Sequence, residues 1–267
     1  MRALLLILLS LVAATAGAES IHRLTIDGTI GPATSRYVID GLEKADAESA
    51  PAVVITIDTP GGLDSAMRDI VQAILDSPVP VIGYVSPSGA RAASAGTYIL
   101  YATHWAAMAP GTNLGAATPV RVGGPPESGD ETDGEPSTME QKRVNDAVAY
   151  IRSLAEMRDR NAEWAERAVR ESVSLSAEAA VADNVIDQVA SDLRAVLDAA
   201  PVDAAGLAID DRPPGWADEF LAAITNPNIT YVLLLVGLYG LIFELANPGA
   251  IVPGVIGGTS LLLALFA

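Results

Sequence analysis

The sequence has no cysteine, two histidines and two lysines among its 267 residues. Without cysteine the chain cannot form disulfide bonds, thiolate metal sites or a cysteine nucleophile. His22 and His104 leave almost no material for a histidine-based zinc site or a Ser-His-Asp triad. Arginine supplies nearly all of the positive charge, so Lys44 and Lys142 are the only lysines available for chemistry.

Positive charge is also scarce overall. The chain has 33 acidic residues against 16 basic ones, a net charge of −17. This balance argues against nucleic-acid binding, which needs a surface rich in Lys and Arg. The sequence also lacks a His-x-x-x-His pair, a calcium loop, a phosphate-binding loop and a dinucleotide fingerprint, so we expect no metal and no cofactor.

Hydrophobic residues, in contrast, make up 50% of the chain, a high share for an acidic protein, and they gather at both ends. Residues 1–18 combine Arg2, an apolar run and a small-residue ending, which predicts a signal peptide cleaved after Ala18. A retained N-terminal anchor is the alternative. Cleavage after export would place the following domain outside the cytoplasm, on the periplasmic or extracellular side.

Residues 220–243 carry no charge, and after Glu244 and the turn Asn247-Pro248-Gly249 the chain is uncharged to its last residue. Each half approaches the ~20 residues that a helix needs to cross a bilayer. We therefore predict a membrane anchor of one or two helices over residues 220–267, with a buried soluble hairpin as the alternative. A charge at membrane depth is costly, so Glu244 should lie at an interface or against a neighbouring helix.

Residues 19–197 alternate between strand and helix patterns, which predicts an α/β domain with parallel strands. Such a domain carries functional residues in the loops after its strands. Residues 121–137 contain four glycines, three prolines and five acids, and we expect a flexible loop there. Residues 198–219 are predicted to be a linker to the membrane. The expected strands are 22–26, 52–57, 79–85, 103–108 and 185–189, and the expected helices are 35–47, 63–74, 137–157 and 162–171.

Two glycine-rich loops follow buried strands. In the first, Gly61 and Gly62 follow Pro60, and glycines there let backbone N–H groups approach a ligand. In the second, residues 86–96, Ser94 can start a helix, where the positive field and free N–H groups suit a nucleophile. The alternatives are an ordinary turn for the first loop and an N-cap serine for the second.

A serine nucleophile needs a base. His22 lies near the start of the domain, and His104 falls in a strand pattern typical of a structural residue. Lys44 sits in a polar, solvated segment, which leaves Lys142 as the better candidate. On an ideal helix over residues 137–157, Lys142 points away from the apolar stripe. The side of the helix that carries it therefore faces the active site, another subunit or solvent. Spacing leaves that choice open.

Three ordered segments, residues 57–62, 89–99 and 108–112, closely resemble NfeD-type membrane-bound serine proteases of the ClpP class. The likeness spans about residues 21–189 and continues into 226–257. It implies a ClpP/crotonase-like α/β fold and peptide-bond hydrolysis by a Ser-Lys dyad. Ser94 matches the nucleophile and Lys142 the general base. Gly61, Gly62 and the N–H of Ala95 match the oxyanion hole.

The resemblance also implies a homodimer that cleaves hydrophobic segments, including the tail of a stomatin-like membrane partner. Long family members add a C-terminal OB-like domain, so we expect a short or truncated form here. The resulting hypothesis is a membrane-anchored serine endopeptidase. The alternative is a non-proteolytic scaffold that binds a stomatin-like partner in the same groove. A signal-peptide-peptidase-like enzyme would share the dyad but usually has a larger, duplicated domain.

Overall fold

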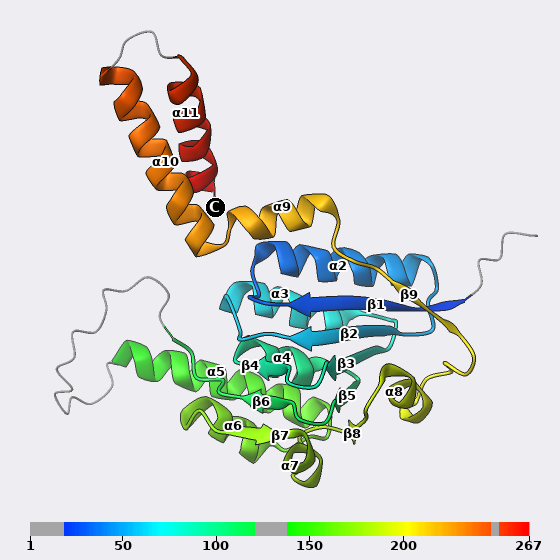
Figure 1. The fold of residues 1–267 in the computed structure, drawn as a ribbon. Coiled ribbons are helices and arrows are strands. Elements are labelled where there is room, and N and C mark those ends of the chain that lie inside the picture. Colours follow the sequence, from blue (N-terminus) through cyan, green and yellow to red (C-terminus); the bar gives the residue numbers. More distant parts are fainter. Residues whose placement is uncertain (1–18, 121–137, 247–250, 267) are drawn as a thin grey trace, which may run out of the picture.

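The computed structural model describes residues 19–120, 138–246 and 251–266, and its centre is a six-stranded parallel sheet (Figure 1). The expected α/β fold with parallel strands is confirmed. The strand order is β8-β5-β3-β2-β1-β9, and each neighbouring pair runs in parallel. The strands are β1 Ser20–Asp27, β2 Val53–Asp58, β3 Val81–Val85, β5 Trp105–Met108, β8 Gln188–Val189 and β9 Ala208–Asp211.

Both faces of the central strands are buried, because alternate side chains enter two separate cores. Val53, Ile55 and Ile57 pack into the larger core, together with most of the helices. Val54 and Ile82 face the smaller core beneath helix α8 (Leu193–Ala199). The helices of the larger core are α2 Pro32–Ala47, α3 Asp64–Asp76, α4 Ala95–Ala102, α5 Thr138–Met157, α6 Ala162–Arg170 and α7 Ala177–Ala182.

A second, three-stranded sheet was not expected from the sequence. It consists of β4 (Arg91–Ala93), β6 (Asn113–Gly115) and β7 (Ser174–Ser176), in the order β4-β6-β7. Strands of three residues are too short to show an alternating pattern, and small residues weaken the strand signal further. This small sheet matters because β4 ends one residue before Ser94.

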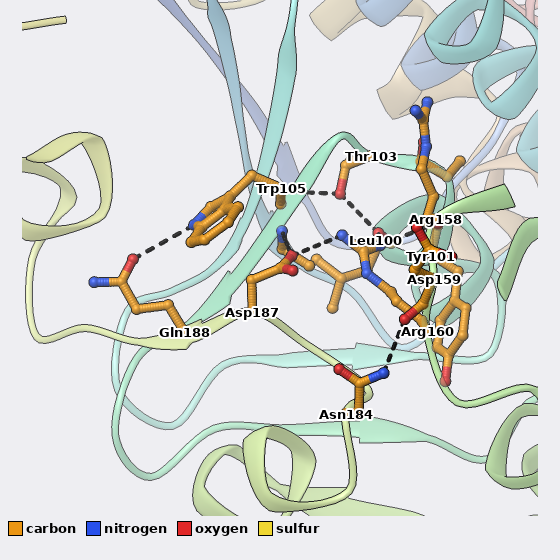
Figure 2. Close-up of polar contacts among 12 residues, drawn as sticks. Leu100, Tyr101, Thr103, Trp105, Arg158, Asp159, Arg160, Asn184, Asp187 and Gln188 are labelled. Atoms are coloured by element: carbon orange, nitrogen blue, oxygen red, sulfur yellow. Dashed lines mark hydrogen bonds and ion pairs between the residues drawn. The ribbon is translucent and has the colours of Figure 1, made fainter. Parts of the chain in front are cut away.

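A buried arginine joins α4 to the sheet (Figure 2). The guanidinium of Arg160 donates to the carbonyls of Leu100 and Tyr101 at 2.8 and 3.1 Å, and to the carboxylate of Asp187 at 2.9 Å. The same Asp187 oxygen accepts from the N–H of Ala106 in β5 at 2.7 Å. Burial lowers the pKa of Arg160, whereas Asp187 opposes that change. Arg160 therefore satisfies the carboxyl end of α4 and links it to β5.

Residues 198–219, expected to be a linker, form part of the domain. They contain β9, whose Ala208–Asp211 pairs with the first residues of β1, and the start of α9 (Trp216–Ile224). Strand β9 holds two aspartates in four residues, and this composition hides a short edge strand from pattern analysis. Between the sheet and α10 (Pro227–Ala246) lie only residues 212–215, α9 and a short turn.

Helices α10 (Pro227–Ala246) and α11 (Ile251–Phe266), in the segment expected to be the anchor, form an antiparallel pair that projects from the domain (Figure 1). Among the described residues one helix, over 228–246, is long and apolar enough to cross a membrane, and α11 is shorter. A side chain at Gly254 would collide with the Glu244 carboxylate, so Glu244 lies against the neighbouring helix as predicted. The expectations for residues 1–18 and 121–137 lie outside the described residues.

We expect Asp187→Ala to lower the free energy of unfolding by about 3 kcal/mol, because it leaves a buried guanidinium without its counter-charge. The Arg160 side chain is only 3% exposed. Denaturation of the chain in detergent, followed by tryptophan fluorescence, measures the change. The matched control is Asp183→Ala, which removes an exposed aspartate and should change stability by less than about 0.5 kcal/mol. Equal losses in the two variants would contradict a structural role for the Arg160–Asp187 pair.

Candidate active site

Ser94 lies on a sharp turn between β4 and α4. Its backbone has φ 52° and ψ −117°, a conformation that residues other than glycine rarely adopt. The N–H of Ser94 donates to the carbonyl of Gly115 in β6 at 2.8 Å, which holds the turn in place. Ser94 stands at the N-cap position of α4, yet its side chain makes no capping hydrogen bond. An ordinary N-cap serine is therefore not what the structure shows, and the half-buried hydroxyl remains available for chemistry.

Thr59 connects the two glycine-rich loops. Its N–H donates to the carbonyl of Arg91 at 2.7 Å, and its carbonyl accepts from the N–H of Ala93 at 3.1 Å. These two bonds extend β2 alongside β4, so the loop after β2 runs next to the turn at Ser94. Thr59 is fully buried and was not singled out from the sequence. Its position directly after the buried strand 52–57 was the available signal.

Gly61 lies in contact with Ser94. A methyl group at Gly61 would stand 2.6 Å from Ser94 Cβ and 3.0 Å from Oγ, and the backbone there has φ +116°. Only glycine suits this position, for both steric and conformational reasons. The N–H of Gly61, however, donates to Thr59 Oγ1 at 3.0 Å. The Gly61 N–H, one of the donors that the resemblance implied for the oxyanion hole, is therefore already used in this bond.

Two other backbone donors lie beside the same turn. No hydrogen bond among the described residues uses the N–H of Gly62, whose backbone packs so closely on Ile30 that a side chain would strike the Ile30 carbonyl oxygen. Ala95 is the first residue of α4, where a helix leaves N–H groups without an acceptor. The structure thus brings Ser94, the two glycines and Ala95 together.

Lys142 lies in the second turn of α5, and its side chain is exposed. Within the described residues it makes no hydrogen bond or ion pair. The apolar stripe of α5 is buried at Ala147, Val148 and Ile151, so Lys142 points away from the core, as its spacing predicted. The question left open by the sequence was what this other side of α5 faces.

On the side of α5 that carries Lys142, the residues one and two turns further along contact α3 and α4. Asp146, one turn after Lys142, accepts from Arg68 Nη2 at 2.6 Å, and Arg68 Nε bonds Asp64 at 2.8 Å. Asp64 opens α3 two residues after Gly62. One turn further along α5, the ring of Tyr150 lies 4.4 Å from the Arg68 guanidinium.

Tyr150 also stacks on Tyr98 in the first turns of α4, with ring centroids 6.0 Å apart. Contacts from both α3 and α4 therefore orient this side of α5, and they join the helices that begin at the two glycine-rich loops. Arg68, Tyr98 and Tyr150 were not predicted from the sequence to belong to the site. Their contacts join residues about 50 to 80 positions apart, a separation that local spacing cannot reveal.

Both histidines lie at the amino ends of the strands, whereas the loops of the site follow the carboxyl ends. His22 pairs in register with Val53, the first residue of β2, whereas Gly61 follows the end of that strand. The ring Nδ1 of His104 accepts from the N–H of Val81, the first residue of β3, at 3.1 Å. Neither ring is therefore placed to serve Ser94. Among the described residues no group of three or more acidic or histidine side chains could hold a metal ion.

A strained serine at a strand–helix turn, with backbone donors beside it, is a geometry that many α/β enzymes use for nucleophilic chemistry. The chain belongs to the NfeD family. Residues 20–199 match the NfeD1b N-terminal domain, and residues 228–267 match the NfeD integral membrane domain. It is a membrane protein.

Membrane-bound protease PH1510 of Pyrococcus horikoshii is 36% identical over 247 residues, which cover 86% of this chain and 54% of PH1510. Membrane protein NfeD1b of Bacillus subtilis is 26% identical over 263 residues, 94% of this chain and 56% of that protein. The chain thus spans about half the length of the curated relatives it matches.

Solved structures of the 1510-N membrane-bound stomatin-specific protease share the fold. A lysine-to-alanine variant in complex with a substrate peptide is 35% identical, covers 79% of this chain and 99% of its own, and has a TM-score of 0.66. A serine-to-alanine variant is 33% identical, covers 74% and 100%, and has a TM-score of 0.65. These relatives are characterised as a protease in which one serine and one lysine have been replaced.

The position of His22 predicts how stability depends on pH. Burial, then Arg212, lowers the pKa of His22 below its ordinary value. As the pH falls through about 6.5, His22 binds a proton in the unfolded chain but stays neutral in the folded chain. The free energy of unfolding therefore decreases. Urea unfolding at about pH 7.5 and about pH 5.5 should therefore show a larger loss in the unaltered chain than in His22→Gln. Identical pH dependence in both proteins would show that His22 is not the titrating group.

Proposed function

We propose that the chain is a membrane-anchored serine endopeptidase that uses a Ser94–Lys142 dyad. The observation that carries this proposal is the strained backbone of Ser94, which places the residue in contact with Gly61. The Ser94 hydroxyl makes no capping hydrogen bond to α4. Strain of this kind persists only where the surrounding structure fixes it, and it is concentrated at functional sites. The likeness to a stomatin-specific protease supports hydrolysis as that function.

The proposed reaction begins when the neutral amine of Lys142 accepts the Ser94 hydroxyl proton as Oγ attacks the scissile carbonyl carbon. The N–H groups of Ala95 and Gly62 donate to the oxygen that becomes negative. Gly61 keeps space open beside Oγ, while its own N–H stays with Thr59. Lys142 then returns the proton to the leaving amine. Water hydrolyses the acyl-enzyme by the same route, so the serine and the amine are regenerated.

Two features of the molecule support Lys142 as the base. The histidines lie at the amino ends of the strands, away from Ser94. Lys44, the other lysine, is an exposed residue of α2. The side of α5 that bears Lys142 contacts α3 and α4, the helices that follow the two glycine-rich loops. These contacts lie one and two turns after Lys142, and they support the proposal that Lys142 acts on Ser94.

The substrate we propose is a hydrophobic segment of a membrane-associated protein, such as the tail of a stomatin-like partner. The support is the characterised specificity of the 1510-N protease. An apolar segment near the bilayer would reach a domain that leaves the membrane through a short connection. We further propose that residues 1–18 are a cleaved signal peptide, that the domain lies outside the cytoplasm, and that the protein forms a homodimer.

Ser94→Ala and Lys142→Ala should each lower the rate at which an apolar stomatin-tail peptide is cleaved by at least about a thousand-fold, because the two groups act as one unit. The chain offers matched controls for both. Lys44→Ala removes the only other lysine, and Ser88→Ala removes an exposed serine of the same loop; both should retain full activity. Full activity of Lys142→Ala would overturn the dyad.

A serine-reactive fluorophosphonate separates the protease from a scaffold that binds the same partner without cutting it. A protease should be labelled at Ser94, and the label should disappear in Ser94→Ala but persist in Ser88→Ala. Gly61→Ala should also lose the label, because its methyl group would meet Ser94. A chain that binds the peptide but is never labelled would be a scaffold.

A further inference from the structure

Helix α9 exposes large apolar side chains next to the membrane segment. Trp216 is 82% exposed and Phe220 is 48% exposed. Residues four apart lie on the same side of a helix, so the two rings form one apolar surface, which we call the Trp216–Phe220 face. Large apolar side chains that are exposed together mark a contact surface for a protein or for a membrane.

The opposite side of α9 is fixed to the domain. The carboxylate of Asp218 lies 3.1 Å from Arg36 Nη2 on α2, and the Asp218 side chain is only 14% exposed. Figure 1 shows α9 running along the outer side of α2. The domain therefore already occupies the polar side of α9, and the Trp216–Phe220 face points away from it.

The connection from α9 to the candidate membrane span is short. Helix α9 ends at Ile224, and the span begins at Asn228. Thr230 Oγ1 donates to the carbonyls of Ile224 and Asn226 at 2.7 and 3.1 Å, so the turn between the helices is hydrogen-bonded. Three intervening residues reach at most about 10 Å. The carboxyl end of α9 must therefore lie close to the level at which the span enters the bilayer.

We propose that α9 is an interfacial helix, with its Trp216–Phe220 face inserted among the lipids of the membrane that α10 crosses. Tryptophan prefers the level of the lipid headgroups, because its ring is apolar and its indole N–H can still bond water or lipid. Tyr231, 64% exposed in the first turns of α10, belongs to the same aromatic belt.

The chemistry of α9 defines which lipids it suits. Its sequence contains Asp218 and Glu219 but no lysine or arginine. Interfacial helices that bind anionic lipids carry basic residues on their polar side. Attachment of α9 is therefore apolar, and it should occur on zwitterionic bilayers without anionic lipid. Because α9 is tied to α2, this attachment sets which side of the domain faces the membrane.

The absence of cysteine allows a direct test in the full 267-residue chain. A nitroxide on Phe220→Cys, in phosphatidylcholine nanodiscs, is assayed for collisions with oxygen, which concentrates in lipid, and with a water-soluble nickel chelate. The aqueous control is Glu163→Cys on α6, also a nine-residue helix with an exposed side. The lipid control is Leu238→Cys on α10, where the side chain is 49% exposed.

We expect the oxygen-to-nickel collision ratio at position 220 to exceed that at 163 several-fold and to approach that at 238. Adding anionic lipid should leave it unchanged. A ratio equal to that at 163 would overturn the proposal, as would exclusion of both reagents, which would mean that another protein surface covers the helix.

A second measurement avoids any change at Phe220. Lipids brominated near the headgroup should quench part of the fluorescence of the unaltered chain, and Trp216→Phe should remove that part, leaving Trp105 and Trp164. Quenching that is the same in both proteins would contradict insertion. Neither readout involves peptide cleavage, so the result is independent of the proposed protease activity.

Discussion

The strained backbone of Ser94 is the constraint on which the rest of the site depends. A residue with a β-carbon rarely adopts φ 52° with ψ −117°, and here the bond to the Gly115 carbonyl and the pairing of β4 with β6 and Thr59 impose it. The turn needs small neighbours on every side. Gly61 contacts Ser94, and a side chain at Gly96 would stand 2.5 Å from Thr59 Cγ2. The glycine and alanine richness of residues 89–96 is the local sequence requirement of this geometry.

The helix that follows Ser94 is held at both ends. Its first N–H groups face the site, and its last carbonyls accept from Arg160 and Arg158, the latter at 2.9 Å to Ala102. Positive charge at the carboxyl end of a helix stabilises the helix dipole. Because α4 has only eight residues, movement at one end would be felt at the other. The Arg160–Asp187 pair is thus part of the support of Ser94, although it lies at the carboxyl end of α4 (Figure 2).

The sequence predicted the elements that carry strong local patterns. Residues 52–57 form an apolar run broken only by Thr56 and predicted β2, and the spacing of Met67, Ile70 and Ile74 identified α3. The short strands β4, β6, β7 and β9 were missed, because pairing with distant segments rather than side-chain periodicity stabilises them. In the site, composition marked the two glycine-rich loops, whereas the family resemblance was needed to choose Ser94 over an ordinary N-cap serine. The involvement of the Gly61 N–H with Thr59 depends on side-chain packing, and no spacing rule reveals it.

The pairing of β9 with β1 has a mechanical consequence. Four residues, Arg212–Gly215, join this edge strand to α9, so the domain has no flexible tether to the membrane anchor. Force on the anchor would pass to the sheet through the β1–β9 ladder, the Arg23–Asp211 pair and the bond from Arg212 to Glu48 at 2.6 Å. A domain mounted in this way cannot sweep a large volume above the bilayer. The domain therefore stays at a nearly constant distance from the bilayer surface, and it can contact only chain segments that emerge at that distance.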